Sequence, residues 1–144
     1  MINDGFNLKG KVEVCLNDEV VREIDNLVVT AGKNFVASSM LKTTSNSPAA
    51  MTHMAIGSNT TNPAAGDTAL GTELGRVALT SSAVSGAVVT YIATFPAGTG
   101  TGAVVEAGIL NASSNGTLLC HTEFDVVNKG SADAITITWT VTVS

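Results

Sequence analysis

The segment 135–143 alternates strictly between large apolar residues and threonine. Its apolar members are Ile135, Ile137, Trp139, Val141 and Val143, and a threonine stands at each position between them. Successive side chains of a β-strand point to opposite faces, so this period of two predicts a strand with one apolar and one polar face. β-Branched and aromatic residues also favour strands. We therefore expect the chain to build an antiparallel sheet around this segment.

The composition indicates one domain with a weakly charged surface. The chain has 144 residues, which is enough for a single hydrophobic core. Charged residues make up 13% of it, against about 25% in typical soluble domains. The net charge is −5 and the seven basic residues are scattered, so we expect no nucleic-acid interface. Such a surface is typical of a protein packed among copies or partners.

The first residues and the cysteines favour synthesis in a cytoplasm. The first residues lack the basic and apolar regions of a leader, and no apolar run approaches the roughly 20 residues of a membrane helix. We therefore expect synthesis in a cytoplasm. Cys15 and Cys120 lie far apart in strand-like runs, which favours two reduced, buried thiols over the alternative of a disulfide.

The remaining patterns predict further strands and one helix. Asn17-Asp18 separates two alternating runs, and Asn115-Gly116 separates two others, so each pair is expected to turn a hairpin. Thr30 can cap a helix over 30–42 that carries an apolar to small stripe through Phe35, Val36, Ser39 and Met40. Other strands are expected at 51–57, 76–80, 86–95, 103–111 and 117–124. The predicted fold is a mainly β, antiparallel β-sandwich of jelly-roll or Greek-key type with one short α-helix, forming a single domain over residues 1–144.

A long polar loop follows the strand at 51–57. It is rich in Asn, Thr, Gly and Pro, residues whose side chains or backbone compete with regular structure. Asp67 is expected to cap a single helical turn over 68–74. A calcium site formed with Asn59 and Asn62 is an alternative, but the spacing matches no EF-hand pattern. Loops longer than about 12 residues often have a function.

The ionisable residues offer little chemistry. Glu106 lies within an apolar strand, where a carboxylate needs hydrogen-bond donors, and we favour bonds to loop amides over the role of catalytic acid. His53 and His121 are expected at the surface or an interface rather than on a metal, because neighbours such as Cys120 and His121 point to opposite faces. No Gly-x-Ser-x-Gly motif is present. We expect no catalytic residue, metal or cofactor, and hence no enzyme.

Several motifs between Met51 and the end resemble virion proteins of tailed bacteriophages. The first group is Ile56-Gly57-Ser58, the Asn/Thr loop, Pro63-Ala64, Gly66-Asp67-Thr68-Ala69-Leu70 and Thr72-Glu73. The second group comprises 95–100, 105–111, 128–133 and 135–143. The resembling proteins are small β-sandwich capsid decoration (cement) proteins and related tail-fibre or tail-tip domains.

This resemblance implies a structural role on the capsid exterior, with assembly in the host cytoplasm. It implies a homotrimer that binds the major capsid protein and stabilises contacts between its copies. The alternative is a tail-fibre, tail-tip or baseplate domain that binds a host receptor or another tail protein; exposed aromatic loops would favour it, but Trp139 and Tyr91 both fall in expected strands. Residues 1–8 form either a short strand or an arm. The expected partner contacts are Phe6, Leu8, Asn59, Thr60, Thr61, Asn62 and Pro63.

Overall fold

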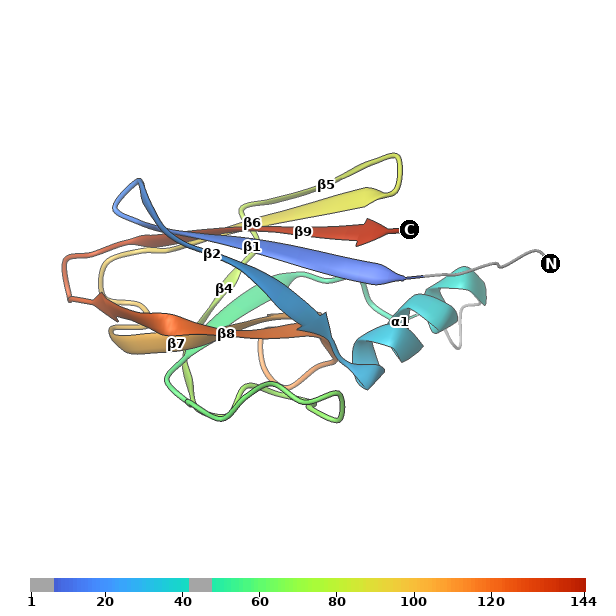
Figure 1. The fold of residues 1–144 in the computed structure, drawn as a ribbon, viewed down its shortest axis with the longest axis horizontal. Coiled ribbons are helices and arrows are strands. Elements are labelled where there is room, and N and C mark those ends of the chain that lie inside the picture. The colour runs from blue at the N-terminus through green and yellow to red at the C-terminus, as the bar shows by residue number, and fades with distance from the viewer. Residues whose placement is uncertain (1–6, 42–47) are drawn as a thin grey trace.

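The described part of the protein folds into nine β-strands and one α-helix (Figure 1). The computed structural model describes residues 7–41 and 48–144. The strands are β1 (Leu8–Leu16), β2 (Glu19–Val28), β3 (His53–Gly57), β4 (Glu73–Ala78), β5 (Ser81–Ser85), β6 (Val88–Phe95), β7 (Gly102–Leu110), β8 (Leu118–Lys129) and β9 (Ile135–Val143). The helix α1 spans Thr30–Leu41.

All nine strands belong to one curled sheet with the order β4-β3-β7-β8-β2-β1-β9-β6-β5. Every ladder is antiparallel. One half of the sheet, β5, β6, β9, β1 and β2, faces the other half across the core, and the short β2–β8 ladder links them (Figure 1). The predicted mainly β, antiparallel fold with one helix is confirmed. The sandwich type stays a prediction, because hydrogen bonds connect the strands in a single order.

The predicted central segment is strand β9, which lies between β1 and β6. Ile135, Ile137 and Trp139 are completely buried. The intervening threonines are half-buried on the other face. Val12 of β1 and Ile109 of β7 belong to the same core cluster, so both halves of the sheet contribute to it. The two-faced character read from the sequence is confirmed.

Both predicted hairpins are present because their turn residues adopt positive φ angles. Asn17 and Asp18 have φ values of 49° and 71° between β1 and β2. Asn115 and Gly116 have φ values of 55° and 80° between β7 and β8. Asn, Asp and Gly tolerate this left-handed conformation better than other residues. The two-residue turn between β1 and β2 requires it, whereas Asn115 and Gly116 lie in a longer loop, 111–117, that joins β7 to β8.

The predicted helix begins at Thr30 and packs against β8. Gly32 is the contact point, since a Cβ there would clash with the carbonyl oxygen of Leu119. Phe35 and Val36 pack against the core, but Met40 is 82% exposed. The predicted apolar stripe therefore extends only over the first half of the helix.

Other predictions need correction. The helical turn expected over 68–74 is wrong, because β4 already begins at Glu73 and pairs with β3. Strand β5 was not predicted at all, and β8 runs to Lys129 instead of ending at 124. Both thiols are free as predicted, although Cys120 is buried and Cys15 only half-buried. Within the described ranges, no helix combines the length and apolarity needed to cross a bilayer.

Candidate functional site

The long polar loop between β3 and β4, residues 58–72, lies against β7 and β8 (Figure 1). We call it the anchored loop. Of the expected contact residues, Thr60, Thr61 and Asn62, which we call the tip of the loop, are exposed, while Asn59 and Pro63 are half-buried. Its outer surface is therefore polar and uncharged at the tip.

Glu106 of β7 holds both ends of the anchored loop. Its side chain is 1% exposed. The carboxylate accepts hydrogen bonds from the backbone N–H groups of Asn59, Gly71 and Thr72, each at 2.9 Å. Several donors are what a buried carboxylate requires. The predicted bonding of Glu106 to loop amides is confirmed.

His121 of β8 extends this cluster to the middle of the loop. Its Nε2 lies 2.9 Å from Glu106 Oε1, and its Nδ1 lies 2.7 Å from Asp67 Oδ2. The side chain is buried because the anchored loop covers this face of β8, so the expected surface position of His121 is wrong. Adjacent strand residues do point to opposite faces, with Cys120 in the core.

Asp67 closes a turn instead of capping a helix. Its carboxylate accepts a hydrogen bond from Ala64 N–H at 2.8 Å and contacts His121. Burial acts to raise the pKa of Asp67, but the bonds from Ala64 and His121 outweigh it and the pKa lies below its usual value. Asp67 is therefore a charged anchor near neutral pH.

The hydrogen bonds of this cluster are directed inward. Both ring nitrogens of His121 are bonded to carboxylates, and Glu106 is occupied by three amides. Asn59 Oδ1 accepts from Thr61 N–H at 2.6 Å, so it also serves the loop. Within residues 7–41 and 48–144, no group of three or more His, Cys, Asp or Glu side chains is arranged for a metal ion. The cluster fixes the loop in place.

The N-terminal contact residues lie apart from this loop in the sequence. Phe6 lies outside the described residues. Leu8 begins β1 and packs, half-buried, against the core. The preceding Asn7 exchanges two backbone hydrogen bonds with Ser144, at 2.7 and 2.8 Å. The described part of the N-terminal segment therefore behaves as a strand, and the arm stays a prediction for residues 1–6.

The structure also contains a buried cation that sequence reasoning missed. Lys129 is 1% exposed, and its ammonium donates to the carbonyl oxygens of Pro96 and Asp133 at 2.9 and 2.6 Å. Burial lowers the pKa of Lys129, and the nearby Asp133 charge partly opposes this. Its place in an Asn-Lys-Gly turn motif gave no signal of burial.

The other histidine, His53, is the first residue of β3 and is half-buried. Its Nδ1 lies 2.8 Å from Thr52 Oγ1.

Comparisons of the chain with protein families, with curated proteins and with solved structures found no match. The resemblance to tailed-phage virion proteins therefore stays a prediction from sequence motifs.

Proposed function

We propose that the protein is a capsid decoration protein of a tailed bacteriophage. In this role it binds the outer capsid surface as a homotrimer and stabilises contacts between copies of the major capsid protein. The proposal rests on the motif resemblance and on one structural observation, the anchored loop. A tail-fibre or tail-tip domain is the alternative, and the buried position of Trp139 gives no support to aromatic recognition of a receptor by that residue.

The anchored loop suits a docking surface because it is held at both ends. Glu106 bonds Asn59 near the start of the loop and Gly71 and Thr72 at its end. A loop that is already ordered loses less conformational entropy when it binds. The exposed threonine and asparagine side chains at the tip can both donate and accept hydrogen bonds.

A docking role also fits the hydrogen bonds of Glu106, His121 and Asp67, which hold the loop in place. In the proposed assembly each contact is modest, and stabilisation arises because the same contact is repeated over a lattice of identical subunits. The low charge of the chain reduces repulsion between closely spaced copies.

The proposal is tested by electron microscopy of labelled protein mixed with purified capsids and, separately, with purified tails from the phage that carries the gene. We expect regular labelling of capsids. The double variant Thr60→Lys, Thr61→Lys should label capsids weakly, whereas Ser131→Lys, an exposed change in another loop, should not differ from the unmodified protein. Labelling of tails alone would favour the tail domain, and labelling of neither would overturn both.

The expected oligomer is tested separately by light scattering. A trimer should have about three times the chain mass of 14.6 kDa. A monomer over the whole accessible concentration range would contradict the homotrimer. Capsid binding would then be decided by the electron microscopy experiment alone.

A further inference from the structure

Strand β5 forms one end of the nine-stranded sheet, and its outer edge has no neighbouring strand in the part of the chain that the structure describes. It pairs only with β6, in a register that runs from Ser81 opposite Ile92 to Ser85 opposite Val88. All five residues of β5 are exposed, and the strand lies along the outside of the molecule (Figure 1). A row of backbone N–H and C=O groups is therefore open to a partner strand.

Two of the five residues of β5 direct their backbone groups outward. The N–H of Thr80 donates to the carbonyl oxygen of Ile92 at 2.7 Å, so the backbone of Ile92 faces β5. The N–H and C=O of one strand residue point to the same side, and that side alternates along the strand. Every second residue of β5, beginning with Ser81 opposite Ile92, therefore bonds to β6. The residues between them, Ser82 and Val84, present their N–H and C=O groups to the outer edge.

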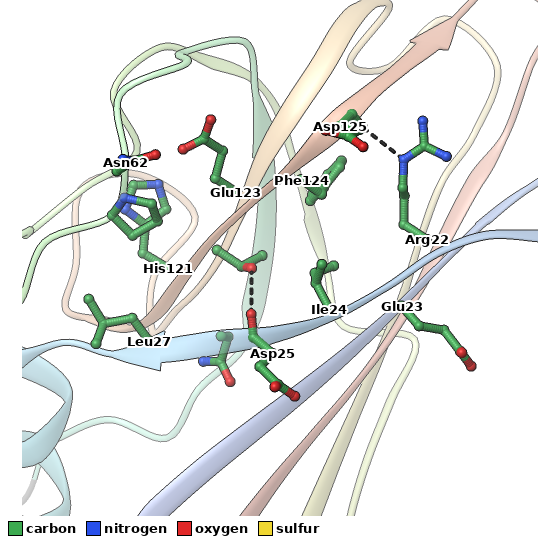
Figure 2. Close-up of a pocket in the computed structure, with 13 residues that line it drawn as sticks. Arg22, Glu23, Ile24, Asp25, Leu27, Asn62, His121, Glu123, Phe124 and Asp125 are labelled. Carbon is green, nitrogen blue, oxygen red and sulfur yellow. Dashed lines mark hydrogen bonds between the residues drawn. The ribbon is translucent and has the colours of Figure 1, made fainter.

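The other end of the sheet is protected, and so is the gap where β2 and β8 separate. Strand β4, at the other end, carries the ion pair between Glu73 and Arg76, and charged residues on an edge discourage strand pairing. Beyond their two paired positions β2 and β8 diverge, but side chains bridge the gap (Figure 2). Arg22 donates across it to the carbonyl oxygens of Asp125 and Val126, at 3.0 and 2.7 Å.

Strand β5 has neither kind of protection. It contains no charged residue and no proline, and the whole stretch 77–105 lacks Asp, Glu, Lys, Arg and His. Its one large apolar side chain, Val84, is 72% exposed. Val84 pairs with the half-buried Val89, and Val89 pairs with the buried Val141, so an apolar row of the sheet continues to this edge. An uncharged edge does not repel an identical edge and offers no attraction to a charged partner.

We propose that β5 pairs with β5 of a second copy, antiparallel and about a two-fold axis at Ala83, so that the two sheets become continuous. In this register Ser82 of each copy lies opposite Val84 of the other, and each such pair exchanges two hydrogen bonds. An axis at Ser82 would set Val84 opposite Thr80, whose N–H already bonds to β6. An axis at Val84 would set Ser82 opposite Gly86 in the turn. Only the axis at Ala83 pairs both outward-facing residues.

The proposed contact is small. A five-residue strand covers much less than the roughly 800 Å² per partner of a stable interface. Free copies should therefore associate weakly, whereas copies held close together should pair readily. The inference is independent of the proposed capsid role, because it depends only on β5. A two-fold contact would join two homotrimers and would not build one.

Disulfide trapping in the full chain tests the pairing. The inward-bonded residues of β5 form the non-hydrogen-bonded pairs across the axis, with Cα atoms about 4.5 Å apart, which is within the range of a disulfide. Ala83 lies opposite its own equivalent. With Cys15→Ser in place to remove the half-buried thiol, Ala83→Cys should therefore form covalent dimers under oxidising conditions.

Ser81→Cys and Ser85→Cys are the matched controls, since both change exposed residues of the same strand. In the proposed register each lies opposite the other, and its own equivalent is about 14 Å away, too far for a disulfide. Each alone should crosslink at least about tenfold more slowly than Ala83→Cys. A mixture of the two should crosslink at a rate similar to that of Ala83→Cys.

Changes of the outward-facing residues test the hydrogen bonds and the register. Val84→Pro removes an outward N–H and leaves the bonds to β6 in place, so it should slow crosslinking of Ala83→Cys at least about tenfold. Ser82→Lys with Val84→Lys sets like charges opposite each other and should have the same effect. Ser82→Lys with Val84→Glu sets opposite charges in both pairs and should restore crosslinking. Circular dichroism confirms the fold of each variant, and the two charge variants decide the test if the proline variant does not fold.

The proposal is overturned if Ala83→Cys crosslinks no faster than Ser81→Cys alone, since that result would show random collision. It is also overturned if the mixture of Ser81→Cys and Ser85→Cys gives no more dimer than either alone, or if the two charge variants behave alike. Absence of crosslinking in every variant would overturn self-pairing and would leave the edge to an extended segment of another protein.

Discussion

Replacing Glu106 by glutamine removes the charge that holds the anchored loop while it preserves the size and shape of the side chain. The carboxylate receives four hydrogen bonds at 2.9 Å, three from backbone amides and one from His121. Glutamine retains a single oxygen, and in one of its two orientations its NH₂ group faces the N–H of Gly71, which also donates. If the oxygen stays with Asn59 and Thr72, the amide of Gly71 loses its acceptor.

The expected loss of stability follows from these contacts. A hydrogen bond to a charged group contributes about 1.5 to 3 kcal/mol, and a buried donor left unsatisfied costs about 1 to 3 kcal/mol. Because the side chain is 1% exposed, water cannot replace the lost acceptor without opening the loop. We therefore expect the free energy of unfolding to fall by about 3 kcal/mol or more, a large share of the ~5 to 15 kcal/mol typical of a domain.

Urea unfolding measures this loss, and the fluorescence of Trp139 reports it, since this is the only tryptophan and it is completely buried. Hydrogen exchange adds a local measurement. The amides of Asn59, Gly71 and Thr72 should lose protection in Glu106→Gln, because their shared acceptor has been weakened.

Glu73→Gln is the matched control. Glu73 is partly exposed and pairs with Arg76 at 2.7 Å. The Arg76 side chain is 9% exposed but also donates to the carbonyl oxygens of Ala112 and Asn115, and glutamine at position 73 still offers it one oxygen. We therefore expect Glu73→Gln to lose about 1 kcal/mol, clearly less than Glu106→Gln. If Glu106→Gln is no less stable than Glu73→Gln and the loop amides stay protected, the assigned role of Glu106 is refuted.

Three further predictions concern stability. Burial raises the pKa of Cys120 to about 12 from its ordinary value of 9.0. The protonated thiol therefore contributes fully to the free energy of unfolding below pH 9.0, and this contribution falls by up to about 1.4 kcal/mol per pH unit above it. With Cys15→Ser already in place, adding Cys120→Ala should make the free energy of unfolding, measured in urea titrations, decline less steeply above pH 9.0. Gly32→Ala should destabilise the protein by about 1 to 3 kcal/mol in thermal unfolding, because the added Cβ meets the Leu119 carbonyl. Asp18→Gly should stabilise it by about 0.5 kcal/mol, because relief of the strain at φ 71° in an Asn-Gly turn exceeds the entropy that glycine adds to the unfolded chain.

Each of these predictions has a contrary outcome. If the free energy of unfolding declines as steeply above pH 9.0 when Cys120→Ala is present, the decline belongs to other groups, such as Tyr91, whose pKa burial also raises. Ser38→Ala, an exposed change in the same helix, should be neutral or slightly stabilising; if Gly32→Ala behaves like it, the close approach to β8 is wrong. A lower melting temperature for Asp18→Gly would contradict the assigned turn geometry.

Residue patterns within a segment predicted its structure correctly where the surroundings of that segment are the same along its whole length. Strand β9 alternates without interruption because it lies between two strands over a core, and its sequence shows this directly. The two hairpins could be predicted because Asn, Asp and Gly relieve the strain of positive φ at the turn itself. Glu106 was also predictable in part, since burial of a carboxylate demands donors, although their identity depends on a loop distant in sequence.

Elements that depend on distant partners were not predictable in this way. All five residues of β5 are exposed, so no apolar period marks it, and it exists because β6 offers a free edge. The burial of His121 depends on the anchored loop, which precedes it by about fifty residues, and nothing next to His121 in the sequence indicates that cover. The separation of β2 and β8 beyond their two paired positions likewise depends on strands that are distant in the sequence, and no residue pattern in either strand indicates it.

The central position of β9 has a consequence for biosynthesis. This strand is translated after the other eight, yet it lies between β1, the earliest of the nine, and β6. Until residue 143 has left the ribosome, those two earlier strands have no shared neighbour and their apolar sides stay open to water and to other nascent chains. Sheets closed by such remote pairings form slowly, so this sheet should close only after β9 has been synthesised and should benefit from a chaperone that shields the unfinished sheet.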